Sequence, residues 1–159
     1  MALNAFLHLK GQKQGDISGS VTQKGREGSI MVIAANHEIM SPVSSPGAGT
    51  AVGKRVHKPF VITKELDKSS PLLYQAMVNN EIMAGWKLDF FAVAANGVEK
   101  QDYTVVLTNA VITDIKFVLP DTKHADTMKL NPYEVLEFTY QSIQWTWTDG
   151  NITATDKWI

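Results

Sequence analysis

The chain has 159 residues, of which 44% are hydrophobic and 19% are charged, and its formal net charge is −1. This length fits a single domain, 1–159, with a substantial buried core. Near-neutral charge without a Lys/Arg cluster gives no electrostatic footprint for nucleic acid or for an anionic membrane. Because the sequence contains no cysteine, disulfides, thiolate catalysis and cysteine-based metal sites are excluded.

The first residues alternate like a strand and not like a signal peptide. Leu3, Ala5, Leu7 and Leu9 occupy every second position, and no basic segment precedes them. Apolar runs elsewhere are shorter than the roughly 20 residues that span a bilayer. We therefore expect neither membrane insertion nor a signal for the general export route.

Short alternating segments predict β-structure along most of the chain. Residues 29–35 are apolar on both faces, which is typical of a strand covered on both sides. Asn96-Gly97 and Asp149-Gly150 are turn sequences that join neighbouring strands. The further candidate strands are residues 56–62, 86–92, 103–107, 111–119 and 135–148, with a short tail strand from Asn151.

The candidate strand 135–148 changes phase in its middle. Its large apolar residues stand first on even and then on odd positions, namely Leu136, Phe138, Tyr140, Ile143, Trp145 and Trp147. Because side chains on a strand alternate between faces, a shift of one residue moves the apolar set to the opposite face. The sequence predicts a β-bulge at Gln141-Ser142, or a strand that passes there between two environments.

One helix is predicted after residue 69. Ser70 suits the N-cap and Pro71 the first helical position, where its missing N–H costs nothing. A helix of about ten residues is marginal alone, so we expect it to lie against a sheet. Its apolar face is formed by Leu72, Leu73, Ala76 and Met77.

Two long segments have the composition of loops. Residues 120–132 are polar and bounded by prolines, and residues 41–53 are rich in Ser, Pro and Gly. Loops of this length in compact domains are commonly functional. The predicted fold class is mainly β: a barrel or sandwich of two packed sheets with one short flanking helix and long loops.

Catalytic and metal-binding motifs are incomplete. The glycine-rich segment 47–55 misses the P-loop pattern, because Ala48 and Arg55 replace its first glycine and its final Ser or Thr. His37 begins a zinc-protease pattern whose second histidine is replaced by Ser41. We therefore expect no enzyme, no catalytic residues, no metal and no cofactor.

The four tryptophans leave two interpretations open. An exposed aromatic row would suit a sugar or a nucleic-acid base. Packing in the core or in a protein–protein interface, where Trp and Tyr are enriched, is favoured for a neutral chain. A small β-barrel module that binds a sugar or another small ligand is thus the alternative function.

Three blocks together resemble the haemolysin-coregulated protein (Hcp) family. They are the opening strand that ends in Lys10-Gly11, the run 58–73 with its sequence DKSSP, and the run 131–147 that ends in Trp147. In order and at compatible spacing, the blocks cover nearly the whole chain, and DKSSP is the most specific of them.

The resemblance implies a structural role in the bacterial type VI secretion system. Members of the family form six-subunit rings that stack into the inner tube of this contractile apparatus. The rings carry small effectors in the lumen, support the spike protein and lie inside the contractile sheath. The resemblance also implies a chain that starts in the cytoplasm and leaves through its own apparatus, without a cleaved signal peptide.

Positions for these contacts follow from the resemblance as expectations. Ring stacking is expected of the first loop, with residues 120–132 as a lesser candidate. The first loop consists of Ser41, Pro42, Val43, Ser44, Ser45, Pro46, Gly47, Ala48, Gly49, Thr50, Ala51, Val52 and Gly53. Contacts between neighbours within a ring are expected at Ile143, Trp145 and Trp147, and lumen lining at Ala34, Ala35 and Asn36.

Overall fold

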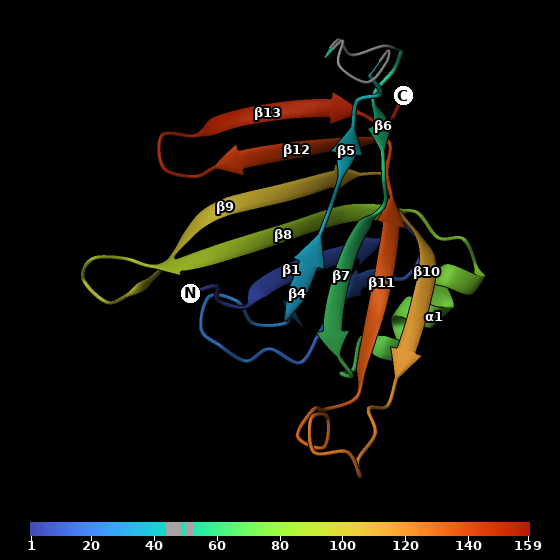
Figure 1. Ribbon diagram of the computed structural model, residues 1–159, viewed down its shortest axis with the longest axis vertical. Coiled ribbons are helices and arrows are strands. Elements are labelled where there is room, and N and C mark those ends of the chain that lie inside the picture. The colour runs from blue at the N-terminus through green and yellow to red at the C-terminus, as the bar shows by residue number, and fades with distance from the viewer. Residues whose placement is uncertain (44–48, 50–52) are drawn as a thin grey trace.

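The computed structural model describes residues 1–43, 49 and 53–159, in which two β-sheets pack face to face with a helix beside them (Figure 1). The sheets are antiparallel throughout, so the mainly β fold class is confirmed. In sheet order, the larger sheet contains β13 (Ile152–Lys157), β12 (Ser142–Trp147), β9 (Glu99–Thr108), β8 (Met83–Val93) and β1 (Ala5–Gly11), and then β2 (Gly15–Ile17) and β3 (Ile30–Val32) along the far edge of β1.

The smaller sheet lies across one part of the larger one (Figure 1). Its order is β10 (Val111–Val118), β11 (Tyr133–Thr139), β7 (Phe60–Glu65) and β4 (Ala34–Asn36). A separate two-stranded ribbon, β5 (Ile39–Met40) with β6 (Val56–His57), extends from the end of the body opposite the 120–132 loop. The helix α1 (Ser70–Val78) lies beside β10.

The chain crosses from one sheet to the other within the segment 29–35. A single strand covered on both sides was expected there, and this expectation is wrong. β3 pairs with β1 of the larger sheet, whereas β4 pairs with β7 of the smaller one. Ile33 lies between them and donates its N–H to the carbonyl of Thr63. Ile30 and Val32 of the first half are buried, whereas Ala34 and Ala35 of the second half are exposed on the edge strand.

The core lies between the facing sheets and is centred on an aromatic group. The Trp86 ring on β8 packs edge-on against Phe60 and Phe138 of the smaller sheet, with centroid distances of 5.2 and 5.6 Å. Leu73 and Ala76 of α1 close the same core. Burying a side chain such as Leu73 contributes about 1.5–3 kcal/mol, which fixes the short helix against the sheets.

The start of α1 differs by one residue from the prediction. Ser69 stands at the N-cap, Ser70 is the first helical residue and Pro71 follows it. Ser70 uses its hydroxyl elsewhere: the oxygen accepts the N–H of Asp67 at 3.1 Å, and the hydroxyl donates to Glu134 at 2.7 Å. Ser70 is thus a link between the helix and the smaller sheet and not the cap.

Gly19 lies where two backbone segments meet, and its N–H donates to the carbonyl of Gly28. A Cβ at Gly19 would lie 2.4 Å from the Ser29 carbonyl oxygen and 2.7 Å from Ile30 Cα. Because backbone atoms cannot swing aside, we expect Gly19→Ala to lower the free energy of unfolding by about 1–3 kcal/mol. Denaturant unfolding measures this change. Gly85→Ala is the control, since its Cβ would lie 3.4 Å from Lys10 Cβ and 3.9 Å from Lys10 N, both without a clash. An equal loss in both variants would contradict the prediction.

Candidate functional site: assembly surfaces

The phase change in the segment 135–148 marks a second passage between the sheets. β11 pairs with β7 and β10 in the smaller sheet, and β12 pairs with β9 and β13 in the larger one. Tyr140 and Gln141 form the corner between the two strands, and Tyr140 is buried. Of the two alternatives, a bulge or a passage between environments, the passage is confirmed.

Exposure increases steadily along the inner face of β12. Ile143 is 1% exposed, Trp145 is partly buried against the core, and Trp147 is 46% exposed. The gradient arises because β12 and β13 extend past the edge of the smaller sheet (Figure 1). The expectation that Ile143 contacts a neighbouring subunit is wrong, because its side chain lies in the chain's own core. Trp147 is accessible to a neighbour.

The exposed part of this face is an apolar ledge. Strand register identifies its members, because residues opposite one another on antiparallel strands share a face. Trp147 lies opposite Tyr103 and Ile152, Trp145 lies opposite Ala154, and Phe90 lies opposite Tyr103. The apolar ledge therefore consists of Phe90, Tyr103, Trp145, Trp147, Ile152 and Ala154.

Packing within the apolar ledge is partial. The Phe90 and Tyr103 rings lie 5.7 Å apart, and burial raises the pKa of the Tyr103 hydroxyl. Ile152, at 66% exposure, has no cover. Of the residues in the apolar ledge, the sequence identified only the two tryptophans. The alternation along β8 and β9 could have added Phe90 and Tyr103. Ile152 could be assigned to this face only from the register of β13.

Another apolar surface lies on the side of the molecule away from the apolar ledge. α1 lies on the right of Figure 1, and the turns of the β8–β9 and β12–β13 hairpins lie on the left. Tyr74 and Val78, one turn apart on the same face of α1, are exposed, with Val78 at 70%. Two different apolar surfaces on opposite sides of one chain can bring successive copies together in the same orientation.

The predicted stacking loop joins the two strands of the β5–β6 ribbon. Ser41, Pro42, Val43, Gly49 and Gly53 are described, and Val43 is 61% exposed. The remaining predicted loop residues, Ser44, Ser45, Pro46, Gly47, Ala48, Thr50, Ala51 and Val52, lie outside the described residues.

The lesser candidate, residues 120–132, lies at the end of the molecule opposite the β5–β6 ribbon (Figure 1). Hydrogen bonds within the loop give it a defined shape: Thr127 Oγ1 donates to the Asp121 carbonyl, and Met128 N to the His124 carbonyl. Met128 and Leu130 are exposed. Two apolar side chains are therefore accessible at this end of the molecule.

The residues predicted to line a lumen form β4. Ala34, Ala35 and Asn36 are all exposed, and β4 is the edge strand of the smaller sheet. Ala34 and Asn36 lie opposite Thr63 and Val61 on the outer face of that sheet. Ala34 and Ala35 therefore leave this part of the edge strand without large side chains.

A buried charge cluster explains the DKSSP block. Lys64 and Glu134 are opposite each other on β7 and β11, both are 0% exposed, and their Nζ and Oε1 atoms lie 2.6 Å apart. Lys64 Nζ also contacts Asp67 Oδ1 at 3.0 Å and donates to Ser70 Oγ at 3.1 Å. Asp67 in turn accepts the N–H of Ser69 at 2.9 Å. The block is thus the junction of α1 with the smaller sheet.

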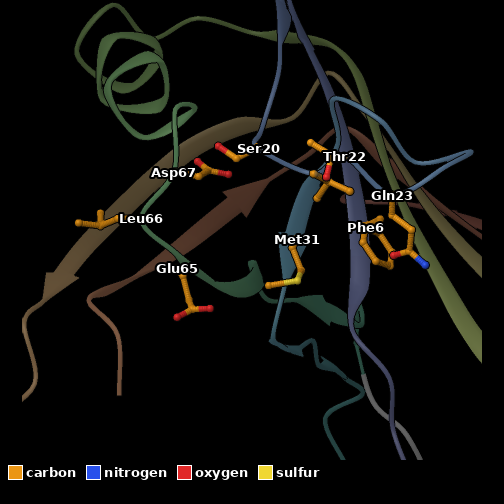
Figure 2. A pocket seen from close by; sticks show the side chains of 9 residues that line it. Phe6, Ser20, Thr22, Gln23, Met31, Glu65, Leu66 and Asp67 are labelled. Atoms are coloured by element: carbon orange, nitrogen blue, oxygen red, sulfur yellow. The ribbon is translucent and has the colours of Figure 1, made fainter. Parts of the chain in front are cut away.

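Figure 2 shows a surface pocket of 350 Å³ beside the end of β7. Phe6 is its single aromatic lining residue, and Glu65 and Asp67 are its charged ones. Asp67 is already bound to Lys64. A sugar-binding module would need a deep pocket with several aromatic rings, and this pocket does not have that lining.

The described part of the chain contains neither a metal-binding cluster nor a membrane-spanning helix. Within residues 1–43, 49 and 53–159, no three His, Asp or Glu side chains gather as ligands for a metal ion. The one helix in the described part of the chain has 9 residues, too few to cross a bilayer.

Comparisons with known proteins agree on one family. A family model described as "Type VI secretion system effector, Hcp" matches residues 6–147. The Major exported protein of Pseudomonas aeruginosa is 35% identical over 167 residues, which cover 99% of this chain and 96% of that protein. Hcp1 of E. coli EAEC 042 has a TM-score of 0.86 at 34% identity, covering 99% of this chain and 100% of that one. Hcp3 of Pseudomonas aeruginosa has a TM-score of 0.81 at 32% identity, covering 98% of each chain. The chain therefore belongs to the Hcp family of type VI secretion system proteins.

Proposed function

We propose that this chain is a structural subunit of the inner tube of a type VI secretion system, in which six copies form a ring and rings stack into the tube. The observation that carries the proposal is the apolar ledge. It continues the core face of the larger sheet beyond the cover of the smaller one, with Trp147 and Ile152 exposed. A contiguous apolar face of this kind is typical of a protein interface.

Within a ring, the apolar ledge of one copy packs against the α1 side of the next. Cyclic rings are built from heterologous contacts, in which one surface meets a different one on the neighbour. The positions of the two apolar surfaces on opposite sides of the chain support this arrangement (Figure 1). Trp147 is the central anchor, since buried Trp side chains dominate interface energetics.

Between rings, the β5–β6 ribbon and its loop, residues 41–53, contact the next ring near the 120–132 loop. The β5–β6 ribbon and the 120–132 loop lie at opposite ends of the molecule, which supports stacking in a single direction (Figure 1). Met128 and Leu130 provide exposed apolar side chains at the receiving end.

The remaining roles concern cargo and export. Ala34, Ala35 and Asn36 line the lumen, where small effectors are carried; their exposure on β4 supports this position. The spike protein and the contractile sheath are the other partners, and the assembled tube passes from the cytoplasm to the exterior through the apparatus. The chain acts by assembly and not as an enzyme.

Solution mass tests the proposal directly. The chain weighs 17.5 kDa, so a ring of six gives about 105 kDa in light scattering coupled to gel filtration, by the closed symmetry of such oligomers. Negative-stain images of the same fractions are expected to show annular particles. A monomer across the accessible concentration range would overturn the proposal. A rise in melting temperature with a sugar would favour a binding module.

A further inference from the structure

The surface pocket of Figure 2 lies at the edge of the larger sheet that is opposite the exposed part of the apolar ledge. Trp147 and Ile152 are on β12 and β13, which form one end of the strand order. Phe6 of β1 and Met31 of β3 line the pocket, and these strands are at the other end. The remaining lining comes from residues 20–23 and from residues 65–67, which lead into α1.

The pocket and the apolar ledge are on opposite faces of the larger sheet. Ala5, Leu7 and Leu9 of β1 lie in the core, so Phe6 between them points to the outer face. Met31 is opposite Phe6 in the register of β1 with β3 and shares that face. The sheet therefore has an apolar surface on its inner face at one edge and a pocket on its outer face at the other edge.

This arrangement allows the larger sheets of neighbouring copies to overlap at their edges. In a cyclic ring the two surfaces that meet belong to different parts of the chain and point toward each other. We propose that Trp147 of one copy inserts into the pocket of the next copy. The inference rests on the proposed function, because it names the site that receives the apolar ledge beside the start of α1.

The lining of the pocket suits a single large aromatic side chain. Its volume is 350 Å³, near the lower end of the range of roughly 300–1,000 Å³ for ligand pockets. Phe6, Met31 and Leu66 supply an aromatic ring, a thioether and an aliphatic side chain, all of which pack well against an indole. Side-chain oxygens of residues 20–23 can accept the indole N–H. Trp147 is half-exposed in the single chain, so it is available to fill the pocket.

One pair of charges beside the two surfaces is complementary. Lys100 is exposed and lines a second surface pocket together with Trp147, and Glu65 lines the receiving pocket. In the described part of the chain, neither Lys100 nor Glu65 forms an ion pair. Insertion of Trp147 brings Lys100 to the mouth of the receiving pocket, where Glu65 is its counter-ion.

Other charged groups at the two surfaces leave this pairing in place. Asp102 and Asp149 line the same pocket as Lys100. On the receiving side, Asp67 is already paired with a lysine of the core, and the backbone N–H of Lys68 donates to a hydroxyl of the pocket lining at 3.3 Å. Both surfaces thus carry charges of both signs, so the positions of the charges, and not the net charge, determine which contacts form.

Charge exchange tests the contact in the full chain. Glu65→Lys would place two lysines at the junction and Lys100→Glu two glutamates, and each variant alone is expected to weaken assembly about tenfold or more, since like charges in contact are unfavourable. Light scattering measures the protein concentration at which half of the chains are in rings. The double variant is expected to recover assembly.

A matched control separates a direct contact from an effect of net charge. Glu65→Lys combined with Lys129→Glu, which changes an exposed lysine of the 120–132 loop, has the same net charge as the exchanged pair. This control is expected to stay as weak as Glu65→Lys alone. Single variants that assemble like the parent, an exchanged pair that does not recover, or equal recovery in the control would overturn the proposal.

Filling the pocket is a second test that does not depend on charge. Thr22→Trp places an indole in the pocket from an exposed position. It is expected to give monomers where the parent forms rings, with an unchanged melting temperature. Thr122→Trp adds the same side chain at an exposed position of the 120–132 loop and is expected to leave single rings intact. Rings of normal mass in Thr22→Trp would overturn the proposal.

The unmodified chain distinguishes failure of this inference from failure of the proposed function. If it forms no rings, the proposed function fails and the inference fails with it. If it forms rings that Trp147→Asp dissociates and Thr22→Trp does not, the apolar ledge remains the ring interface, but the pocket is not the surface that receives it.

Discussion

Replacing Lys64 by methionine is expected to lower the free energy of unfolding by about 3–5 kcal/mol, the usual result of breaking a buried ion pair from one side. Glu134 would keep a carboxylate inside the core without its cation, and its Oε2 atom already has no hydrogen-bond partner among the described residues. Ser70 and Asp67 would lose the same ammonium group. The start of α1 would then separate from the smaller sheet.

Two further variants isolate the ion pair. Lys68→Met removes an exposed lysine from the same block and is expected to change stability by less than about 0.5 kcal/mol. Lys64→Met combined with Glu134→Leu removes both charges and is expected to recover much of the loss. Denaturant unfolding at one protein concentration measures all three, because assembly links stability to concentration. A Lys64→Met chain as stable as the parent would contradict a structural role for the cluster.

The elements that the sequence predicted well are those whose side chains alternate between core and solvent. Trp86 and Leu88 have the period of two that a half-buried strand requires, and both lie in the core. Gly97 adopts a positive φ of 81° in the turn between β8 and β9, as its Asn-Gly sequence predicts. Local sequence patterns identify such elements because side-chain alternation and turn geometry depend on neighbouring residues.

Contacts between distant strands were not predictable in the same way. In the sequence, Lys64 is a polar residue on a predicted strand. Only the register of β7 with β11 shows that it lies opposite Glu134. Ser70 was the predicted cap from its place before Pro71. In the structure neither hydroxyl caps the helix: that of Ser69 binds Asp67, and that of Ser70 binds Glu134, 64 residues away.

The burial of Ile143 could not be predicted from the alternation of apolar residues alone. The alternation correctly placed Ile143, Trp145 and Trp147 on one face. It contains no information on how far the opposite sheet extends, and this extent decides that Ile143 is core while Trp147 is surface. The boundary between core and interface is a property of the packed sheets.

Trp147→Asp is expected to convert rings into monomers without unfolding the chain. A buried Trp at an interface contributes roughly 2 kcal/mol or more, about 30-fold in the affinity of each contact. Because every subunit of a closed ring repeats the contact, the effect multiplies around the ring. The Trp147 side chain is half-exposed in the single chain, so its loss removes little from the core. Light scattering and the melting temperature, measured on one sample, report assembly and folding separately.

Two control variants separate an effect on assembly from an effect on folding. Ile143→Asp changes the same face of the same strand where it is 1% exposed, and there a buried charge is expected to unfold the chain. Leu119→Asp changes a residue exposed at 62%, next to the 120–132 loop, and is expected to leave single rings intact. If Trp147→Asp still forms rings, the apolar ledge is not the ring interface. If instead it unfolds the chain as Ile143→Asp does, the core extends to the end of β12. Only loss of assembly with an unchanged fold identifies the uncovered part of the larger sheet as the surface that a second copy completes.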